Sequence, residues 1–166
     1  MKIINAPKFH PVASMPLSAE VKLTAINKWR LNNNLAQLAS VPPPQITLTP
    51  KAPTLGGLNY LDVHADYHTQ QGHEAIVLSP GDYVAITFQI SDGKTYLLDV
   101  TGSGITRWNY ELQVAGKITT SGEITPQQGH LLLPFIAASS SVIVVLSPAA
   151  GHFGGQFLSA QLTRVG

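Results

Sequence analysis

Apolar and polar side chains alternate in short segments along most of the chain, from Gly57 onward. In the segment 82–90, Val84, Ile86 and Phe88 fall on one face, because successive side chains of a strand point to opposite faces. Turn sequences such as SPGD and SDGK separate these segments. The pattern predicts half-buried antiparallel strands, which we place at 58–68, 74–79, 82–90, 95–100, 105–115, 117–124, 130–137, 142–147 and 156–164.

One of these segments, ITRWNYELQV, carries aromatic and aliphatic side chains on a single face. Trp108, Tyr110, Leu112 and Val114 share that face, which we interpret as a core face. No helix-length spacers separate the strands, which argues against a parallel α/β sheet. The sequence therefore predicts an all-β fold, an antiparallel β-sandwich or jelly roll.

The first third of the chain has a different pattern. Residues 17–39 show helical spacing, with Ser18 as a plausible N-cap. Three asparagines at 32–34 interrupt the pattern, so the region is predicted to form either two short helices or one long helix. Three consecutive prolines follow in a stiff connector, which has room for one edge strand at 46–49. We predict an N-terminal arm with a helix and a proline-rich connector over 1–53, and a β-sandwich domain over 54–166.

The predicted helical arm carries apolar side chains that a single helix cannot bury by itself. Such side chains must pack on the chain's own body or on a neighbouring molecule. The interface candidates are Trp29, Leu31, Leu35 and Leu38. We therefore predict a homo-oligomer or a protein partner, with the arm mediating self-association.

Composition excludes several classes of partner. Only 11% of the 166 residues are charged, the net charge is +1, and the ten basic residues form no run. A surface that binds nucleic acid or an anionic membrane needs a cluster of basic residues, so neither partner is expected.

No apolar run is long enough to cross a bilayer, and the first residues lack a signal-peptide pattern. We expect a cytoplasmic protein as made, unless it is exported by another route.

Residues 62–74, DVHADYHTQQGHE, concentrate imidazole and carboxylate groups in a chain with few charges. If 58–68 is a strand, Asp62 and three later polar side chains share one face and could converge on a transition metal. The alternative is the polar outer face of a half-buried strand, which requires no cofactor. The candidate metal ligands are His64, Asp66, His68, His73, Glu74 and His152.

Part of this stretch resembles the cupin family of metal-binding jelly rolls. Glu74 and Gly81 have the six-residue gap of the first cupin motif, and GDYVAI follows as that motif does. Pro148, Gly151 and His152 echo the second motif. The resemblance implies metal binding by His68 or His73, with Glu74 and His152. The close pair of histidines that begins the cupin motif is absent here, since His64 and His68 are four residues apart.

Other catalytic patterns are weak. The chain has no G-x-S-x-G segment, and it has no cysteine for a thiol nucleophile or a thiolate metal site. No cofactor is required by the sequence. We therefore favour a non-enzymatic binding or assembly module. The alternatives are a cupin-like metal-dependent enzyme that uses the His64–Glu74 cluster, and a carbohydrate-binding module with an exposed aromatic side chain.

Overall fold

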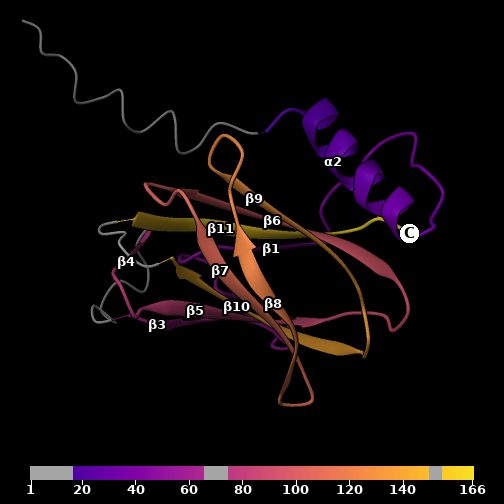
Figure 1. The fold of residues 1–166 in the computed structure, drawn as a ribbon. Helices are drawn as coiled ribbons and strands as arrows, with labels where there is room; N and C mark the ends of the chain where they lie inside the picture. Colours follow the sequence, from indigo (N-terminus) through magenta and orange to yellow (C-terminus); the bar gives the residue numbers. More distant parts are fainter. Residues whose placement is uncertain (1–16, 66–74, 150–154) are drawn as a thin grey trace, which may run out of the picture.

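The computed structural model describes residues 17–65, 75–149 and 155–166. Two antiparallel β-sheets pack face to face, and one α-helix lies against the outer face of one of them (Figure 1). This confirms the predicted all-β sandwich. All nine strands predicted from the alternation are present, with ends that differ by a few residues.

The first sheet, sheet A, is the one that the helix covers. Its strand order is β1–β11–β6–β9, and β4 pairs with another part of β11. Pairing of β1 with β11, from Ile46↔Leu162 to Leu48↔Ala160, makes the predicted edge strand part of this sheet. The strands are β1 (Ile46–Leu48), β4 (Ile76–Leu78), β6 (Thr95–Ser103), β9 (His130–Ile136) and β11 (Gly155–Arg164).

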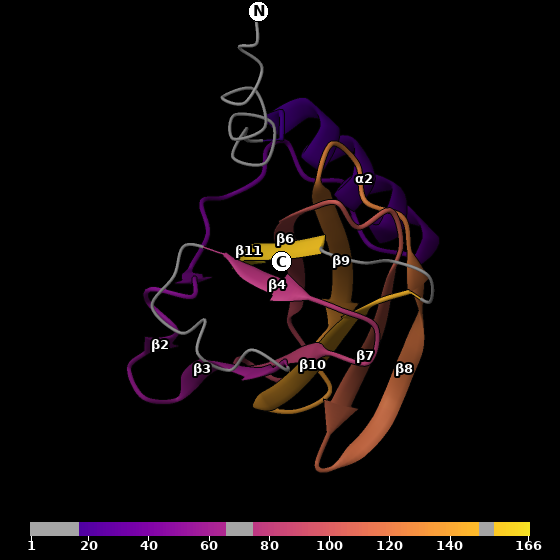
Figure 2. The same cartoon turned by 90° about the vertical axis from the view of Figure 1, so that its left-hand side faces the viewer.

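The second sheet, sheet B, has the order β2–β3–β5–β10–β7–β8. A tight turn at Ala115 and Gly116, both with positive φ, joins β7 to β8. Figure 2 shows β8 at the outer side of this sheet, with β7 as its neighbour. The strands are β2 (Thr54–Leu55), β3 (Asn59–His64), β5 (Tyr83–Gln89), β7 (Trp108–Val114), β8 (Lys117–Ile124) and β10 (Ser141–Pro148).

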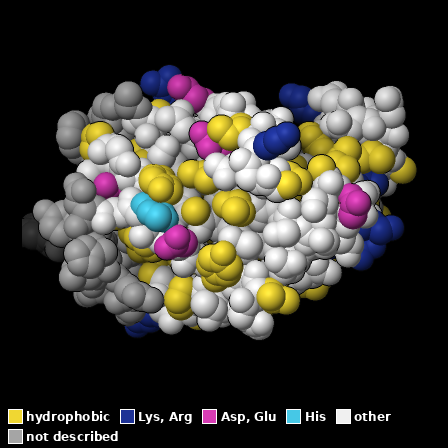
Figure 3. Space-filling view, turned by 90° about the horizontal axis from the view of Figure 1, so that it is seen from below, with side chains coloured by type: hydrophobic (Ala, Val, Ile, Leu, Met, Phe, Trp, Pro, Cys, Tyr) yellow, Lys and Arg dark blue, Asp and Glu magenta, His cyan; other side chains and the backbone are white. Residues whose placement is uncertain are grey.

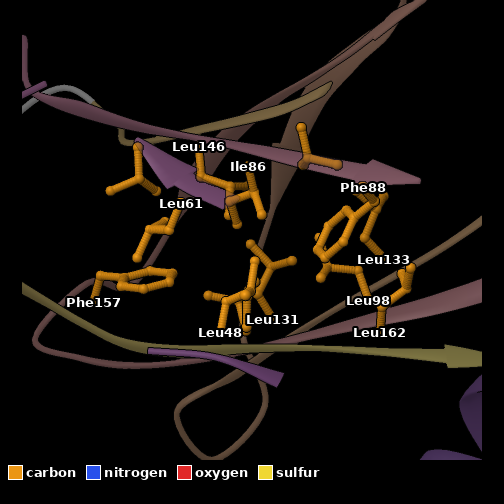
Figure 4. Packing of buried hydrophobic residues seen from close by; sticks show 14 of the residues in the cluster. Leu48, Leu61, Ile86, Phe88, Leu98, Leu131, Leu133, Leu146, Phe157 and Leu162 are labelled. Atoms are coloured by element: carbon orange, nitrogen blue, oxygen red, sulfur yellow. The ribbon is translucent and has the colours of Figure 1, made fainter. Parts of the chain in front are cut away.

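The core fills the space between the two sheets. Leu48 and Phe157 from sheet A meet Leu61 and Ile86 from sheet B in the close view of Figure 4. The alternating faces predicted for β5 and β7 are confirmed, since both strands direct their predicted apolar sets into this core. The inner face of sheet B is thus committed to packing, and its outer face remains available for other contacts.

The helix α2 (Ala19–Asn32) packs on the outer face of sheet A. Ser18 is its N-cap and accepts a hydrogen bond from the backbone N–H of Val21, as the sequence predicts. Ile26 is fully buried against Leu97 of β6 and Val165, the residue that follows β11. The structure therefore has one helix over the predicted helical region, docked on its own sheet. Within the described ranges, no helix is long and apolar enough to cross a membrane.

Candidate binding trough and the predicted site residues

Most of the predicted metal ligands fall outside the part of the chain that the structure describes. They are Asp66, His68, His73, Glu74 and His152. Among the described residues, no group of three or more histidine, aspartate or glutamate side chains could hold a metal ion. The metal site and the cupin-like alternative therefore stay predictions.

His64, the remaining candidate, lies on the exposed face of β3. Its Nε2 donates to Asp62 Oδ2 at 2.8 Å, and its ring stacks on Tyr83 of β5 with centroids 4.4 Å apart and planes 11° apart. His64 and Tyr83 are paired across the two strands. His64, near the start of the histidine-rich stretch, therefore holds the Tyr83 ring in place on the outer face of sheet B.

The predicted interface residues of the arm divide into two kinds. Trp29 and Leu38 are partly buried against the small cluster that joins α2 to sheet A. Leu31 is 55% exposed, and Leu35 is half-buried. The arm is therefore docked within its own chain, and self-association through it stays a prediction.

The outer face of sheet B carries a trough that runs across four of its strands. One hollow of about 570 Å³ extends from Tyr83 at the start of β5 to β10 and β7, and a second of about 380 Å³ continues to β8. Both are within the range of small-ligand sites. The residues common to the two hollows are Asn109, Glu111, Val145 and Ser147.

The strand register explains why these side chains meet. Ser147 of β10 is paired with Asn109 of β7, which is paired with Glu123 of β8, so the three form one row across the sheet. Val145, Glu111 and Ser121 form a neighbouring row. With a spacing of about 4.8 Å between strands, the trough spans roughly 14 Å from β5 to β8.

The lining of the trough is polar, and its charges are negative. Glu111 and Glu123 contribute carboxylates, and no lysine, arginine or histidine is among the described residues that line either hollow. Asp82 also borders the trough, but its side chain is buried and accepts from the backbone N–H of Ser79. Gln113 donates from Nε2 to Glu111 Oε1 at 3.1 Å, and Arg107 donates to Glu123 Oε1 at 3.3 Å. Val145 and the ring of Tyr83 supply apolar surface between these groups. Figure 3 shows such a mixture of apolar and acidic side chains on this side of the molecule, with a histidine among them.

A separate cluster of charged groups lies under the helix. Asp99 of β6 accepts from His130 Nδ1 at 2.7 Å and pairs with Lys22 Nζ of α2 at 2.7 Å. Burial by itself raises the pKa of Asp99, but the hydrogen bonds and charges of His130 and Lys22 together hold this pKa below its ordinary value. Because the three groups sit between helix and sheet, the cluster fastens the arm to the sandwich.

An apolar cleft of about 500 Å³ opens at the side of the sandwich where β8 and β9 end their sheets. Leu112, Val114, Leu133 and Phe135 line it, together with Trp29 of the helix. Leu112, Leu133 and Phe135 are buried residues of the main core. We therefore interpret the cleft as the open margin of the core, and the trough as the candidate site.

No protein-family model matches the sequence, and no curated protein matches it. Similar solved structures include a family GH115 4-O-methyl-alpha-glucuronidase, at 7% identity and a TM-score of 0.49 over 79% of this chain. This chain spans only 19% of that protein. A family 35 carbohydrate-binding module from Clostridium thermocellum matches at 12% identity and a TM-score of 0.35, over 61% of this chain and 96% of the module.

The carbohydrate-binding module CBM36, solved in complex with calcium and xylotriose, matches at 14% identity and a TM-score of 0.40, over 71% of this chain and 99% of the module. Two of these three structures are thus carbohydrate-binding modules. At these identities and TM-scores, the likeness assigns neither a ligand nor a site to this chain.

The residues of the trough were not singled out by the sequence pattern. The alternation in β5 and β7 does place Tyr83, Asn109 and Glu111 on outward faces. The alternation does not give the order of strands in the sheet, so it does not show that β10 lies between β5 and β7. The sequence signal that could have located the trough is a tyrosine and two polar residues on the outward faces of segments whose inward faces are fully apolar.

Proposed function

We propose that this protein is a non-enzymatic module that binds a neutral, hydroxyl-rich ligand, a carbohydrate, in the trough of sheet B. The observation that carries the proposal is the lining: carboxylates, amides and hydroxyls around a tyrosine and a valine, with no cation among the described lining residues. Such groups accept from and donate to sugar hydroxyls, while apolar surface suits the C–H faces of a sugar ring.

The charge of the trough narrows the ligand class. An anionic ligand such as a phosphate or a uronic acid would face Glu111 and Glu123, and the cation that contacts this lining, Arg107, is already paired with Glu123. A neutral ligand avoids that repulsion, and its hydroxyls can donate to the same carboxylates. Neutral oligosaccharides are therefore favoured over acidic ones.

The two glutamates of the trough suit binding better than proton transfer. Glu111 accepts from Gln113, and Glu123 from Arg107, so each carboxylate is held by a neighbouring side chain of its own chain. These bonds orient the carboxylates before a ligand arrives, which reduces the entropy lost on binding. We therefore propose recognition without a chemical step.

The test is calorimetric titration of the full chain with short neutral oligosaccharides selected on a glycan array, alongside acidic oligosaccharides of equal length. We expect saturable binding of a neutral sugar and weaker binding of the acidic set. Tyr83→Ala should weaken binding about tenfold, equivalent to about 1.4 kcal/mol. His64→Ala should weaken it less, since His64 acts by positioning the Tyr83 ring.

Tyr60→Ala is the matched control. Tyr60 is a tyrosine on the same outer face, 41% exposed, but it does not line the trough and pairs with Thr87 further along β5. Its loss should leave the affinity unchanged. If no neutral sugar binds, or if Tyr60→Ala and Tyr83→Ala weaken binding equally, the trough is not the carbohydrate site.

Self-association through the arm is a second proposal, and its support is the exposed Leu31 of α2. Because Trp29 and Leu38 already pack on sheet A, Leu31 is the arm side chain best placed to meet another molecule. Leu31→Asp should then lower the mass measured by light scattering while the helix stays folded. An unchanged mass would show that self-association does not depend on Leu31.

A further inference from the structure

The Tyr83 ring stands upright at the β5 end of the trough. The rings of Tyr83 and of His64 on the neighbouring strand β3 are 11° from parallel, with centroids 4.4 Å apart. Two rings lying flat and side by side on a sheet could not bring their centroids so close, so the two planes face each other across the gap between the strands. His64 is itself held by Asp62 at 2.8 Å. One face of the Tyr83 ring is therefore covered, and the ring projects away from the sheet.

The trough lies on the other side of this ring. Tyr83 is among the residues that line the hollow over β5, β10 and β7, whereas His64 is not. Continuing the pairing of β10 with β5, and of β10 with β7, puts Ser147 and Asn109 in the same row as Tyr83. The free face of the ring is therefore directed along the trough. Among the described residues, the Tyr83 ring separates the trough from β3.

The turn before β5 fixes this end of the trough. Pro80 and Gly81 also line the hollow, and they are the two central residues of a β-turn in which Gly81 has a φ of 91°. The backbone N–H of Asp82 donates to the Ser79 carbonyl oxygen, and the N–H of Ser79 donates to the Asp82 carboxylate, each at 2.9 Å. These two bonds hold the turn, and with it the start of β5 at Tyr83, before any ligand binds.

The opposite end of the trough lies at the edge of the sheet. Ser121 and Glu123 line the trough there, and their strand, β8, is the last strand of sheet B. Among the described residues, no strand pairs with the free side of β8. A chain-like ligand can therefore leave the trough over β8, whereas at β5 it meets the Tyr83 ring.

We propose that the trough binds the end of a neutral sugar chain, with the terminal unit stacked on the free face of Tyr83 and the rest of the chain leaving over β8. This inference rests on the proposed carbohydrate-binding role and adds which part of the chain is bound. Stacking on an upright ring turns one edge of the terminal sugar toward the sheet, where Ser147 and Asn109 can bond to its hydroxyls. An internal unit cannot take this position, because the chain would have to continue through the rings of Tyr83 and His64.

The test compares the number of chain ends with the mass of sugar. A neutral polysaccharide of the linkage selected on the glycan array is digested mildly with an endo-hydrolase, until the number of ends has risen about tenfold and the fragments still fill the trough. The digested and undigested samples then compete with an immobilised oligosaccharide for the full chain of this protein. We expect the digested sample to inhibit at about one tenth of the mass, because inhibition follows the molar concentration of binding sites. In a series of purified oligosaccharides, the affinity per chain should stop rising once the trough is filled.

Variants test whether the two rings cause the preference for chain ends. The double variant Tyr83→Ala with His64→Ala removes both rings, so the binding that it retains should be inhibited equally by equal masses of the two samples. Tyr60→Ala should keep the tenfold difference, because Tyr60 does not line the trough. A tenfold difference that persists in the double variant would overturn the role of the rings.

Failure of this inference is distinguishable from failure of the proposed function. If no neutral sugar competes, the carbohydrate-binding role itself is refuted. If the two samples inhibit the wild type equally by mass, while Tyr83→Ala weakens binding and Tyr60→Ala does not, the trough remains the carbohydrate site and chain-end binding is overturned. An affinity per chain that keeps rising with length would overturn it as well, because longer chains offer more internal positions.

Discussion

The ion pair between Lys22 and Asp99 should account for much of the stability of the docked helix. Lys22 Nζ lies 2.7 Å from Asp99 Oδ2, and the two side chains are 21% and 4% exposed. At that separation, Coulomb attraction is roughly 1.5 kcal/mol in bulk water and roughly 6 kcal/mol at an effective dielectric constant of about 20. Desolvation of both groups offsets part of this attraction.

Replacing Lys22 by methionine keeps a long side chain over the sheet and leaves a buried carboxylate that retains its hydrogen bond from His130. We expect the free energy of unfolding at pH 7 to fall by about 2–3 kcal/mol, because a buried charge that loses a partner retains its desolvation cost. For a chain of this size, the melting temperature should drop by roughly 4–12 °C.

Asp99→Asn provides the matched background. Asparagine has nearly the same shape as aspartate but no charge, so Lys22→Met in that background should cost less than about 1 kcal/mol. Urea unfolding of the four proteins in this cycle measures the coupling between the two residues. If Lys22→Met lowers the free energy of unfolding equally in the wild-type and Asp99→Asn backgrounds, the ion-pair argument is refuted. The effect of Lys22→Met would then come from packing alone.

The pH dependence of the same cycle follows from the lowered pKa of Asp99. A carboxyl whose pKa is lower in the folded state contributes stability that is present above its unfolded pKa, about 3.9. That contribution is lost as the pH falls through the lower folded value. The loss in free energy of unfolding caused by Lys22→Met should therefore be largest near neutral pH and become smaller below about pH 4.

Further predictions concern the helix anchor, the core and the metal hypothesis. Arg30→Lys should lower the free energy of unfolding by about 1–3 kcal/mol, because Arg30 donates to the Ala36 and Val165 carbonyl oxygens in a geometry that an ammonium group cannot reproduce. Gly102→Ala should cost about 1–3 kcal/mol in the same urea assay, since its Cβ would lie 2.7 Å from the Gln156 carbonyl oxygen. If residues 62–74 are only a polar face, protein prepared without chelator should contain no stoichiometric metal in elemental analysis. Its melting curve should then be the same with and without EDTA, and a lowered melting temperature would favour the metal site.

The sandwich could be predicted from the sequence because alternation reports burial directly. Segments 82–90 and 105–115 each show one apolar face, and both faces lie in the core. The short strand β2 gave no such signal, since both of its residues are exposed. Strand order could not be predicted either, because the alternation specifies which face is buried and not which strands are neighbours.

The face on which the helix docks was harder to predict for a physical reason. Hydrophobic spacing picks out Val21, Ala25 and Trp29 as one stripe of α2. The residues that tie the helix to sheet A include Lys22, Ile26 and Arg30, also one stripe, in which two of three side chains are cations. Cations are seldom buried without partners, and the partners, Asp99 and the Val165 carbonyl, are distant in sequence. Only tertiary contacts identify this face.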